Sequence, residues 1–533
     1  MALISVILLL LAALHHSDGA LHFASYYGDH MVLQKAPHRA VLWGYGPEGE
    51  QVTVYLLGPV LQKVSSAPVT EGIWQVTLDP VHAGGPYDVY AVSESSICHL
   101  ADVLFGDIWL CGGQSNMYFN TSQIFNASEE LALASKYPHV RPFMAALKAS
   151  KTELIDLIQV EIPWSVPTTS VVAEFSAVCW LFGRYMYEKL KYPIGLVESC
   201  WGGTPVEAWS SPRALKQCGL LHNEDNSMLN KTILWNAMIH PFLNMTIYGA
   251  IWYQGEANAE FNRDKYNCSF PAMINDWRMA FHQGSGGQTA PDFPFGFVQL
   301  STNRNVSTDD GFPDIRWHQT ADVGYVPNSR MENTFMAVAL DLPDKASPYG
   351  TIHPRDKQDV ALRLTLGARA VAYGEKEVSF QGPFPKQILP LKTSINITYD
   401  QAVSVTESDV ALRLTLGARA VAYGEKDVSF QGPFPKQILP LKTSINITYD
   451  QAVSVTASKN MFEVCCPEKN VSCESKSFWF PAAILAWNQT SIQLFSASCP
   501  PSKVAALRYA WADWPCEFKA CPVYDASGNL PAP

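Results

Sequence analysis

Charge is scarce in this chain. Only 16% of its 533 residues are Asp, Glu, Lys or Arg, whereas ordinary globular proteins have about 25%. Hydrophobic residues make up 47% and aromatic residues 12%, a composition that excludes intrinsic disorder and coiled coil. Acidic residues outnumber basic ones by 49 to 38, which gives a net charge of −11. Because an acidic chain repels phosphate backbones, we expect no nucleic-acid partner.

Long apolar runs are also missing. No stretch of the chain reaches the eighteen or so apolar residues that a membrane span needs, so no span is expected. The run at residues 3–14 is too short to cross a bilayer, and polar residues and then Gly19 and Ala20 follow it. This order is typical of a cleavable secretory signal, which we place at residues 1–20. The sequence therefore predicts a secreted or lysosomal protein.

The cysteines lack the paired C-x-x-C spacing of zinc sites, so no metal is expected. Six of the twelve cysteines fall within residues 465–521. In an exported chain this cluster predicts a disulfide-stapled C-terminal region, with the pairing left open. Ten Asn-x-Ser/Thr sequons in a chain with a signal predict a glycoprotein. They are at Asn120, Asn126, Asn230, Asn244, Asn267, Asn305, Asn396, Asn446, Asn470 and Asn488.

The middle of the chain alternates short apolar strands with helical stretches. Strands are expected at residues 103–111, 194–199 and 248–253, each followed by a Gly-containing turn, and a helix at residues 177–190. This alternation predicts an α/β fold with a parallel sheet and a site at the carboxyl ends of its strands. Short strands rich in β-branched and aromatic residues precede and follow this core. We expect these flanking β-rich regions to pack together as one accessory unit.

One segment occurs twice. Residues 359–406 return as residues 409–456, and the only difference is Glu377 against Asp427. Repeat folds diverge between units and need about three copies to bury a core. The helix expected at residues 360–373 can fill its groove only once, so its twin at residues 410–423 needs another place. We therefore expect one copy to be an extruded insertion.

The chain thus divides into five parts. These are the signal at 1–20, a β-rich region at 21–100, the α/β core at 101–376, a strand-rich segment with the duplication at 377–458, and a cysteine-rich β region at 459–533.

The strongest local signal is the block GQSNM at residues 113–117. An apolar strand enters a Gly-Gly turn there and presents Ser115 before a short helix. Glycines allow the tight turn, and backbone N–H groups at such a turn suit a developing negative charge. This is how a serine nucleophile is displayed, although a serine in this place can also simply cap a helix.

Three further blocks follow expected strands or precede an expected helix. The turn after residues 194–199 contains Gly203, whose backbone N–H is a second candidate donor to the developing negative charge. The third block, residues 252–258, carries Gln254, whose side-chain amide is a candidate donor to the same negative charge. It also carries Glu256, which we expect to orient a neighbouring residue. The fourth places His353 before a helix. Four such blocks meeting in one crevice indicate a catalytic site.

Together, the blocks GQSNM, GGTPVEAW, WYQGEAN and IHPRDK resemble those of the SGNH-type carbohydrate esterases. The resemblance covers the mature chain except the duplicated fifty residues. It implies a serine esterase that removes O-acetyl groups from sialic acids through an acyl-enzyme and without a cofactor. The 9-position is the expected acetyl site, the 4-position is the alternative, and the preference between them stays open. The O-acetylated sialic acid or sialoglycan would be its partner, and the oligomeric state stays open.

The resemblance also implies roles for single residues. Ser115 matches the nucleophile and His353 the general base, while the N–H groups of Ser115 and Gly203 and the Gln254 amide match the oxyanion donors. Many members carry Asp three residues before the histidine, whereas this chain has Gly350. The acid partner is therefore open among Asp341, Asp344 and Asp356, unless the enzyme uses a Ser–His dyad. Glu256 and Arg355 are candidate substrate-binding residues, and a guanidinium suits the sialic acid carboxylate.

Two other functions fit the same blocks. A non-catalytic glycan-binding protein could share the scaffold, but it could dispense with the Ser, His and Gln that this chain keeps. An acetylesterase of another polysaccharide would carry similar blocks.

Overall fold

The computed structural model describes most of the chain. The described residues are 20–221, 231–304, 309–382, 461–467, 473, 478–487, 491–499, 503–521 and 523–525, with further strands at 385–390, 395–399, 403–404, 435–440 and 445–449. They form two compact units. Unit 1 comprises residues 1–297, 318–335 and 355–375, and unit 2 comprises residues 298–317, 336–354 and 376–533. The expected signal at 1–20 lies outside the described residues except for Ala20.

A largely parallel sheet forms the core of unit 1. Its order is β10-β9-β11-β8-β12-β13-β14. The strands are β8 (Ile97–Gly113), β9 (Val140–Ala145), β10 (Val160–Ile162), β11 (Ile194–Cys200), β12 (Gly249–Tyr253), β13 (Phe295–Gln299) and β14 (Thr334–Val338). β11 runs parallel to β8 and β9, and β12 runs parallel to β8 and β13. The α/β fold class is confirmed. The strands of a parallel sheet are buried on both faces, which explains why their sequences are continuous apolar runs.

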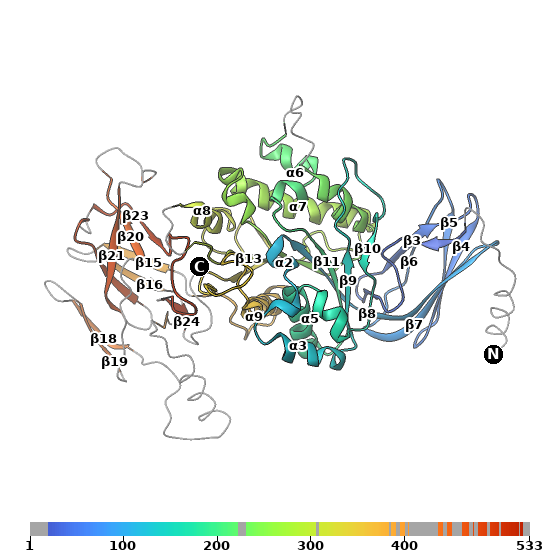
Figure 1. Cartoon of the computed structure of the whole chain (residues 1–533), viewed down its shortest axis with the longest axis horizontal. Coiled ribbons are helices and arrows are strands. Elements are labelled where there is room, and N and C mark those ends of the chain that lie inside the picture. Colours follow the sequence, from blue (N-terminus) through green and yellow to red (C-terminus); the bar gives the residue numbers. More distant parts are fainter. Residues whose placement is uncertain are drawn as a thin grey trace, which may run out of the picture. The chain divides into compact units, whose positions relative to one another are not determined.

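Helices cover both faces of this sheet. Figure 1 shows α5 (Ala177–Leu190) and α9 (Lys357–Gly367) on one side and α6 (Pro212–Gln217) and α7 (Tyr266–Gly284) on the other. The helix expected at 177–190 is confirmed, and the Ser176 hydroxyl caps it by accepting the N–H of Cys179. Two disulfides hold these layers: Cys111–Cys179 joins β8 to α5, and Cys218–Cys268 joins the end of α6 to α7.

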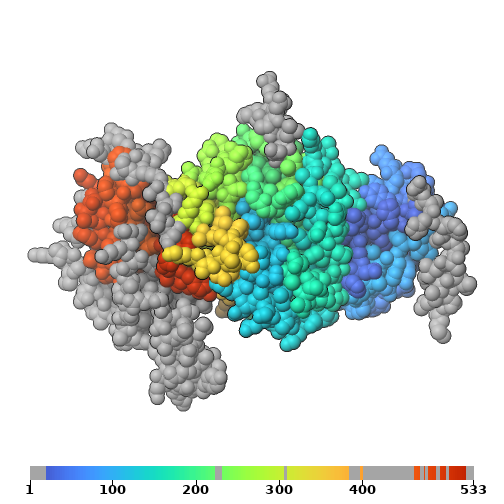
Figure 2. Space-filling view, viewed as in Figure 1, coloured from blue at the N-terminus to red at the C-terminus, as the bar shows by residue number. Residues whose placement is uncertain are grey.

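The N-terminal strands belong to unit 1. β7 (Gly84–Val92) pairs antiparallel with the first part of β8, and β4 (Gln51–Leu57) pairs with β7 and with β5 (Gln62–Pro68). A second small sheet contains β1 (His22–Phe23), β3 (Val41–Tyr45) and β6 (Ile73–Thr77). Figure 2 shows the blue N-terminal residues against the cyan core surface. The expectation of one accessory unit made of both flanking regions is therefore wrong, because β8 runs unbroken from the N-terminal sheet into the core.

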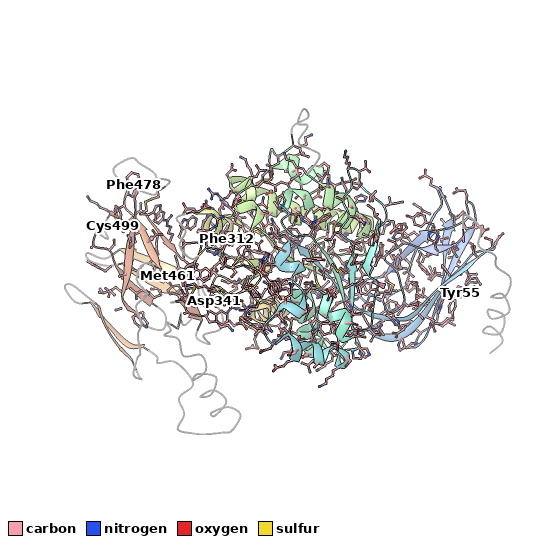
Figure 3. The ribbon with its side chains drawn as sticks, in the orientation of Figure 1. Tyr55, Phe312, Asp341, Met461, Phe478 and Cys499 are labelled. Atoms are coloured by element: carbon pink, nitrogen blue, oxygen red, sulfur yellow. A yellow bond between two sulfur atoms is a disulfide. The ribbon has the colours of Figure 1, made fainter. Side chains whose placement is uncertain are left out.

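The C-terminal region forms a six-stranded sheet in unit 2, of order β15-β16-β22-β21-β20-β23. Its strands are β15 (Pro385–Pro390), β16 (Ile395–Tyr399), β20 (Phe462–Cys465), β21 (Trp479–Trp487), β22 (Ser491–Phe495) and β23 (Ala506–Tyr509). Figure 3 labels Met461, Phe478 and Cys499 in this part. Three disulfides confirm the expected stapling: Cys465–Cys473, Cys466–Cys499 and Cys516–Cys521. The pairing between distant cysteines could not be read from spacing.

The two copies of the duplicated segment have different strand partners. β15 and β16, from copy one, join the C-terminal sheet through β22. β18 (Pro435–Pro440) and β19 (Ile445–Tyr449) carry the same letters, yet the structure pairs them with each other as a separate two-stranded sheet. Copy one also supplies α9 and the turn Ala368–Ala372, as expected for residues 360–373. The twin helix at 410–423 lies outside the described residues.

Candidate active site

Three parallel strands of unit 1 end at the same level. The register pairs Gly113 at the end of β8 with Cys200 on β11 and with Tyr253 on β12. Beyond these ends the backbone stays bonded, because the Trp201 N–H donates to the Gly113 carbonyl at 3.0 Å and the Gln114 N–H donates to the Tyr253 carbonyl at 2.9 Å. The turns that follow β8, β11 and β12 therefore emerge side by side, as the sequence predicted for the first three blocks.

The first turn requires glycine at residue 113. Gly113 has φ +139°, and a Cβ there would lie 2.2 Å from the Tyr253 carbonyl oxygen. Only glycine accepts that close approach of two backbones. The chain then enters the short helix α2 (Ser115–Tyr118), which displays Ser115 with its side chain partly exposed. The sequence thus places a serine hydroxyl at the carboxyl edge of the central strand.

The second turn lies against this serine. A Cβ at Gly202 would be 3.3 Å from the Cβ of Ser115. The next residue, Gly203, is exposed and has φ +72°, a conformation that favours glycine. The Thr204 hydroxyl donates to the Trp201 carbonyl at 2.6 Å and so fixes the turn. The backbone at residues 202–203 is therefore held next to the Ser115 side chain.

Gln254, the expected side-chain oxyanion donor, makes hydrogen bonds within the protein. Its side chain is fully buried, and its Nε2 donates to the Thr204 carbonyl at 3.2 Å and to Oδ1 of Asn258 at 2.7 Å. Its Oε1 accepts the Tyr266 hydroxyl at 3.0 Å. An amide nitrogen carries two hydrogens, and both are used within the protein. Gln254 therefore braces the second and third turns, and the sequence could not reveal its contact with Thr204 because that residue is 50 positions away.

Glu256 is buried and orients its neighbour. The residue is 6% exposed, and its Oε1 accepts a hydrogen bond from Nδ2 of Asn116 at 2.6 Å. Burial raises the pKa of this carboxyl, while the hydrogen bond from Asn116 lowers it. This geometry matches the expectation that Glu256 orients a neighbour rather than the expectation that it meets substrate. Asn116 directly follows Ser115, so the contact ties the β12 turn to α2.

His353 lies in unit 2, in a turn that its own neighbours hold. Its backbone N–H donates to the Gly350 carbonyl at 2.9 Å, and its carbonyl accepts the Ser347 hydroxyl at 2.7 Å. The ring atom Nδ1 is 2.8 Å from the Tyr349 carbonyl oxygen. Because a carbonyl only accepts, Nδ1 carries the hydrogen in this contact and Nε2 has the lone pair of the neutral ring. Gly350 has φ +89°, which disfavours an aspartate at that position.

The three candidate carboxylates have different surroundings. Asp356 caps α9, because its Oδ1 accepts the Asp359 N–H at 3.1 Å. Asp341, labelled in Figure 3, is fully buried in unit 2, where its backbone carbonyl accepts the Lys519 N–H at 2.6 Å. Asp344 is 7% exposed. The Tyr349 backbone carbonyl is one acceptor of His353 Nδ1.

Arg355 is half-buried in unit 1 and stacks on a ring. Its guanidinium lies over the Phe125 ring at 4.5 Å from the ring centroid, and its carbonyl accepts the Phe125 N–H at 3.2 Å. Stacking uses the flat face of the guanidinium, whereas carboxylates bind its edge. Phe125 was not among the predicted residues, since nothing in its sequence neighbourhood marks it as a partner of Arg355.

Two further residues of the quoted blocks also belong to this region. Asn116 bridges Glu256 and the side chain of Lys357, which donates to Asn116 Oδ1 at 2.6 Å. Neither residue had a strong signal in the sequence, where Lys357 was only a charged residue at an otherwise apolar position of a helix. Within the described residues no cluster of three His, Cys, Asp or Glu side chains is arranged to hold a metal ion.

Four sequons have described side chains. Asn126 is exposed, and Asn120, Asn244 and Asn267 are half-buried. The amide nitrogen of Asn120 donates to Glu174 at 3.1 Å, and that of Asn267 donates to Asp322. The side chains of the other sequons lie outside the described residues. Attachment of glycans thus stays a prediction, with Asn126 the most accessible of these four sites.

Five disulfides among the described residues indicate that the chain folds in an oxidising compartment, outside the cell or in a lumen. In the described part of the chain, no helix combines the length and the apolar character that crossing a bilayer requires.

Known proteins resemble this chain along nearly its whole length. A family described as carbohydrate esterase, sialic acid-specific acetylesterase matches residues 105–362, and one described as the sialate O-acetylesterase C-terminal domain matches residues 437–533. The chain is 45% identical to the sialate O-acetylesterase of Homo sapiens over 532 residues, which covers 96% of this chain and 91% of that protein. It is 44% identical to the enzyme of Mus musculus, with 99% and 96% covered.

The fold is also found in a solved structure. A carbohydrate acetylesterase from Xanthomonas citri superposes with a TM-score of 0.72 at 24% sequence identity, covering 96% of this chain and 98% of that one. On the strength of the long matches to curated relatives, the chain belongs to the sialate O-acetylesterase family and is a carboxylic ester hydrolase.

Proposed function

We propose that this protein hydrolyses O-acetyl esters of sialic acids, with Ser115 as the nucleophile. The observation that carries this proposal is the display of Ser115 on a glycine turn where β8, β11 and β12 end together. The substrate class comes from its relatives, which are sialate O-acetylesterases at about 45% identity. The 9-position, with the 4-position second, is the acetyl site proposed.

In the proposed reaction His353 is the general base. Its Nε2 takes the Ser115 hydroxyl proton while Oγ attacks the acetyl carbonyl carbon, and the carbonyl electron pair moves onto oxygen. When that intermediate collapses, the bond to the sugar oxygen breaks and Nε2 returns the proton to this oxygen. The acetyl group stays on Ser115. Water then repeats the sequence, releases acetate and restores the serine.

A backbone carbonyl orients the base in this proposal. The Tyr349 carbonyl accepts the Nδ1 hydrogen of His353, so Nε2 keeps the lone pair that proton removal needs. A carbonyl is neutral, so it supports the imidazolium less than a carboxylate does, but it fixes the same tautomer. A Ser–His dyad and a triad completed by Asp341, Asp344 or Asp356 are the two alternatives, and replacing each aspartate by asparagine separates them.

The backbone N–H groups of Ser115 and Gly203 are the proposed oxyanion donors. Support comes from the contact distance that a Gly202 Cβ would have to Ser115, which places this backbone beside the serine. Gln254 acts indirectly, since its amide holds the Thr204 carbonyl of the same turn. Arg355, held on Phe125, is proposed to bind the sialic acid carboxylate. Export to the secreted or lysosomal compartment is proposed from the expected signal.

A substrate panel tests the proposed function. Acetate release would be measured from 9-O-acetyl and 4-O-acetyl sialic acid and from acetylated xylan. Release from the sialic acids at least about tenfold faster than from xylan is expected. Faster release from xylan would favour the polysaccharide esterase, and no release from any ester would favour a glycan-binding protein.

A further inference from the structure

A fully buried lysine lies behind the proposed nucleophile. Lys357 is the first residue of α9 and is 0% exposed. Lysine is almost never fully buried unless it is paired, because moving an ammonium out of water is unfavourable by several kcal/mol. Full burial of Lys357 therefore depends on partners that hold its ammonium.

Three contacts of the Lys357 ammonium involve α2, the residue after α2 and the last residue of β12. Its Nζ donates to Oδ1 of Asn116 at 2.6 Å and lies 4.9 Å and 5.2 Å from the ring centroids of Phe119 and Tyr253. Both rings are buried, and cation–π attraction is stronger away from water. The lysine is thus held in place by α2 and its flanking residue on one side and by the end of β12 on the other.

The chain of contacts continues through Asn116 to Glu256. Asn116 accepts from Lys357 with its oxygen and donates from Nδ2 to Glu256 Oε1 at 2.6 Å. These two bonds fix which way the amide faces, because only its oxygen accepts and only its nitrogen donates. Three segments far apart in sequence are joined: the start of α9, the helix that carries Ser115, and the turn after β12.

From this arrangement we infer that Lys357 is a positioning residue for Ser115. By fixing Asn116, the next residue along the chain, Lys357 sets the orientation of α2 and with it the direction of the Ser115 hydroxyl. The inference rests on the proposed role of Ser115 as nucleophile. A shift of about 1 Å in a reacting group is enough to lower a rate about 10²-fold.

The helix itself does not depend on this lysine. Asp356 already caps α9, and the buried side chains of Val360, Ala361 and Leu364 anchor its apolar face. An apolar residue at position 357 would avoid the desolvation of an ammonium, but it would leave the Asn116 oxygen without this donor and the buried Glu256 carboxyl without this positive charge. The ammonium therefore acts on Asn116 and Glu256, which lie at the turns after β8 and β12, rather than on α9 itself.

The first test replaces the ammonium. Lys357→Met keeps the length of the side chain and removes the donor, and Lys35→Met is the matched control. Lys35 also pairs with a fully buried carboxylate, Asp107, at 3.0 Å, but it does so six residues before Gly113 on β8, about 20 Å from the strand ends. The melting temperature, kcat and KM on 9-O-acetyl sialic acid would be measured for both variants, together with the labelling rate of Ser115 by a fluorophosphonate.

We expect Lys357→Met to lower kcat and the labelling rate about 10²-fold while KM changes less than about threefold. Lys35→Met is expected to lower the melting temperature and to leave kcat unchanged. Wild-type kcat and labelling in a folded Lys357→Met variant would overturn the inference, as would losses that only follow the melting temperature. Fluorophosphonate labelling needs no sialic acid, so a wrong substrate assignment and a wrong positioning role give different results.

A second variant gives a pH signature. In Asn116→Asp the new carboxylate keeps an acceptor for Lys357 but faces Glu256, and two adjacent carboxylates hold their contact only when they share a proton. The ratio of variant to wild-type labelling rate should therefore rise as the pH falls from 8 to 5. A flat ratio for Asn116→Asp would contradict the inference.

Discussion

The carbonyl oxygen of Tyr349 accepts a hydrogen bond from Nδ1 of His353 at 2.8 Å. This contact occupies the ring atom that an aspartate would face in a full triad. Gly350, which replaces the aspartate of many related esterases, has φ +89° and makes the turn that brings the carbonyl to the ring. The absence of that aspartate and the presence of the carbonyl contact are thus two aspects of one local conformation.

Replacing the nearby aspartates tests this account of the base. Asp341→Asn, Asp344→Asn and Asp356→Asn should each keep kcat within about tenfold of wild type, whereas loss of the acid in a full triad lowers kcat about 10⁴-fold. Asn at 356 still caps α9, so that helix should be unaffected. The measurement is kcat on 9-O-acetyl sialic acid, with the melting temperature as a control for folding. A 10³-fold loss in a folded variant would identify a carboxylate partner instead.

Arg355→Gln should weaken substrate binding. A charge-assisted bidentate pair is worth about 1.5–3 kcal/mol, so KM for 9-O-acetyl sialic acid should rise about tenfold or more. The methyl ester of the same substrate has no carboxylate, and its KM should be the same for variant and wild type. If the variant raises KM equally for the acid and for its methyl ester, Arg355 acts by packing on Phe125 and not by binding the carboxylate.

The sequence predicted the turns of this site better than the contacts between them. Ser115 and Gly203 follow strands that the apolar pattern revealed, and parallel strands bring their carboxyl ends to one edge. Thr204, which accepts from Gln254, and the partners of Lys357 come from segments 50 or more residues away. No local pattern carries that information, so the sequence could not show that the Gln254 amide donates to the Thr204 carbonyl.

The sequence also did not show how the flanking strands pair with the rest of the chain. Their β character was clear from composition, but the continuation of the core strand β8 into the N-terminal strands depends on its pairing with β7, which no run of letters specifies. Disulfide pairing, such as Cys111 with Cys179 across 68 residues, was likewise beyond the sequence.

Stability should fall as the pH rises, because of Glu198. This residue of β11 is fully buried and accepts the Ser176 N–H at 2.8 Å and the Cys200 thiol at 3.2 Å. Burial raises the pKa of Glu198 to about 8, from an ordinary value of 4.5. The folded protein therefore keeps a proton that the unfolded chain releases, so this contribution to stability is full below pH 4.5 and is lost as the pH rises through about 8.

The variant Glu198→Gln removes this titration. Its melting temperature should decline less than that of wild type between pH 5 and pH 8, measured by calorimetry at matched ionic strength. Glu129→Gln, at an exposed position in the first turn of α3 (Ala127–Leu133), is the control and should follow wild type. Parallel curves for Glu198→Gln and wild type would show that Glu198 does not set the pH dependence.

Removing copy two of the duplication should change activity and thermal stability little. Copy one supplies α9 and the strands β15 and β16 of the C-terminal sheet, whereas β18 and β19 pair with each other. A chain without residues 409–458 should therefore match wild type in kcat and melt within a few degrees of it. A clear fall in the melting temperature would mean that copy two contributes to the fold.

A charged residue placed in copy one tests whether copy two can replace copy one in the C-terminal sheet. Ile397 on β16 is 0% exposed, and Ile397→Asp would bury an unpaired carboxylate at a cost of several kcal/mol. We expect the same destabilisation in the full chain and in the chain without residues 409–458. Milder destabilisation in the full chain would show that β18 and β19 can take the place of β15 and β16.

The most direct measurement compares wild type with Ser115→Ala. Acetate release from 9-O-acetyl sialic acid would be followed for both purified glycoproteins, with the melting temperature confirming that the variant is folded. The account predicts a loss of about 10³-fold or more in the variant, because the hydroxyl that forms the acyl-enzyme is gone. Equal rates in the two proteins would remove Ser115 from the reaction and contradict the proposed mechanism.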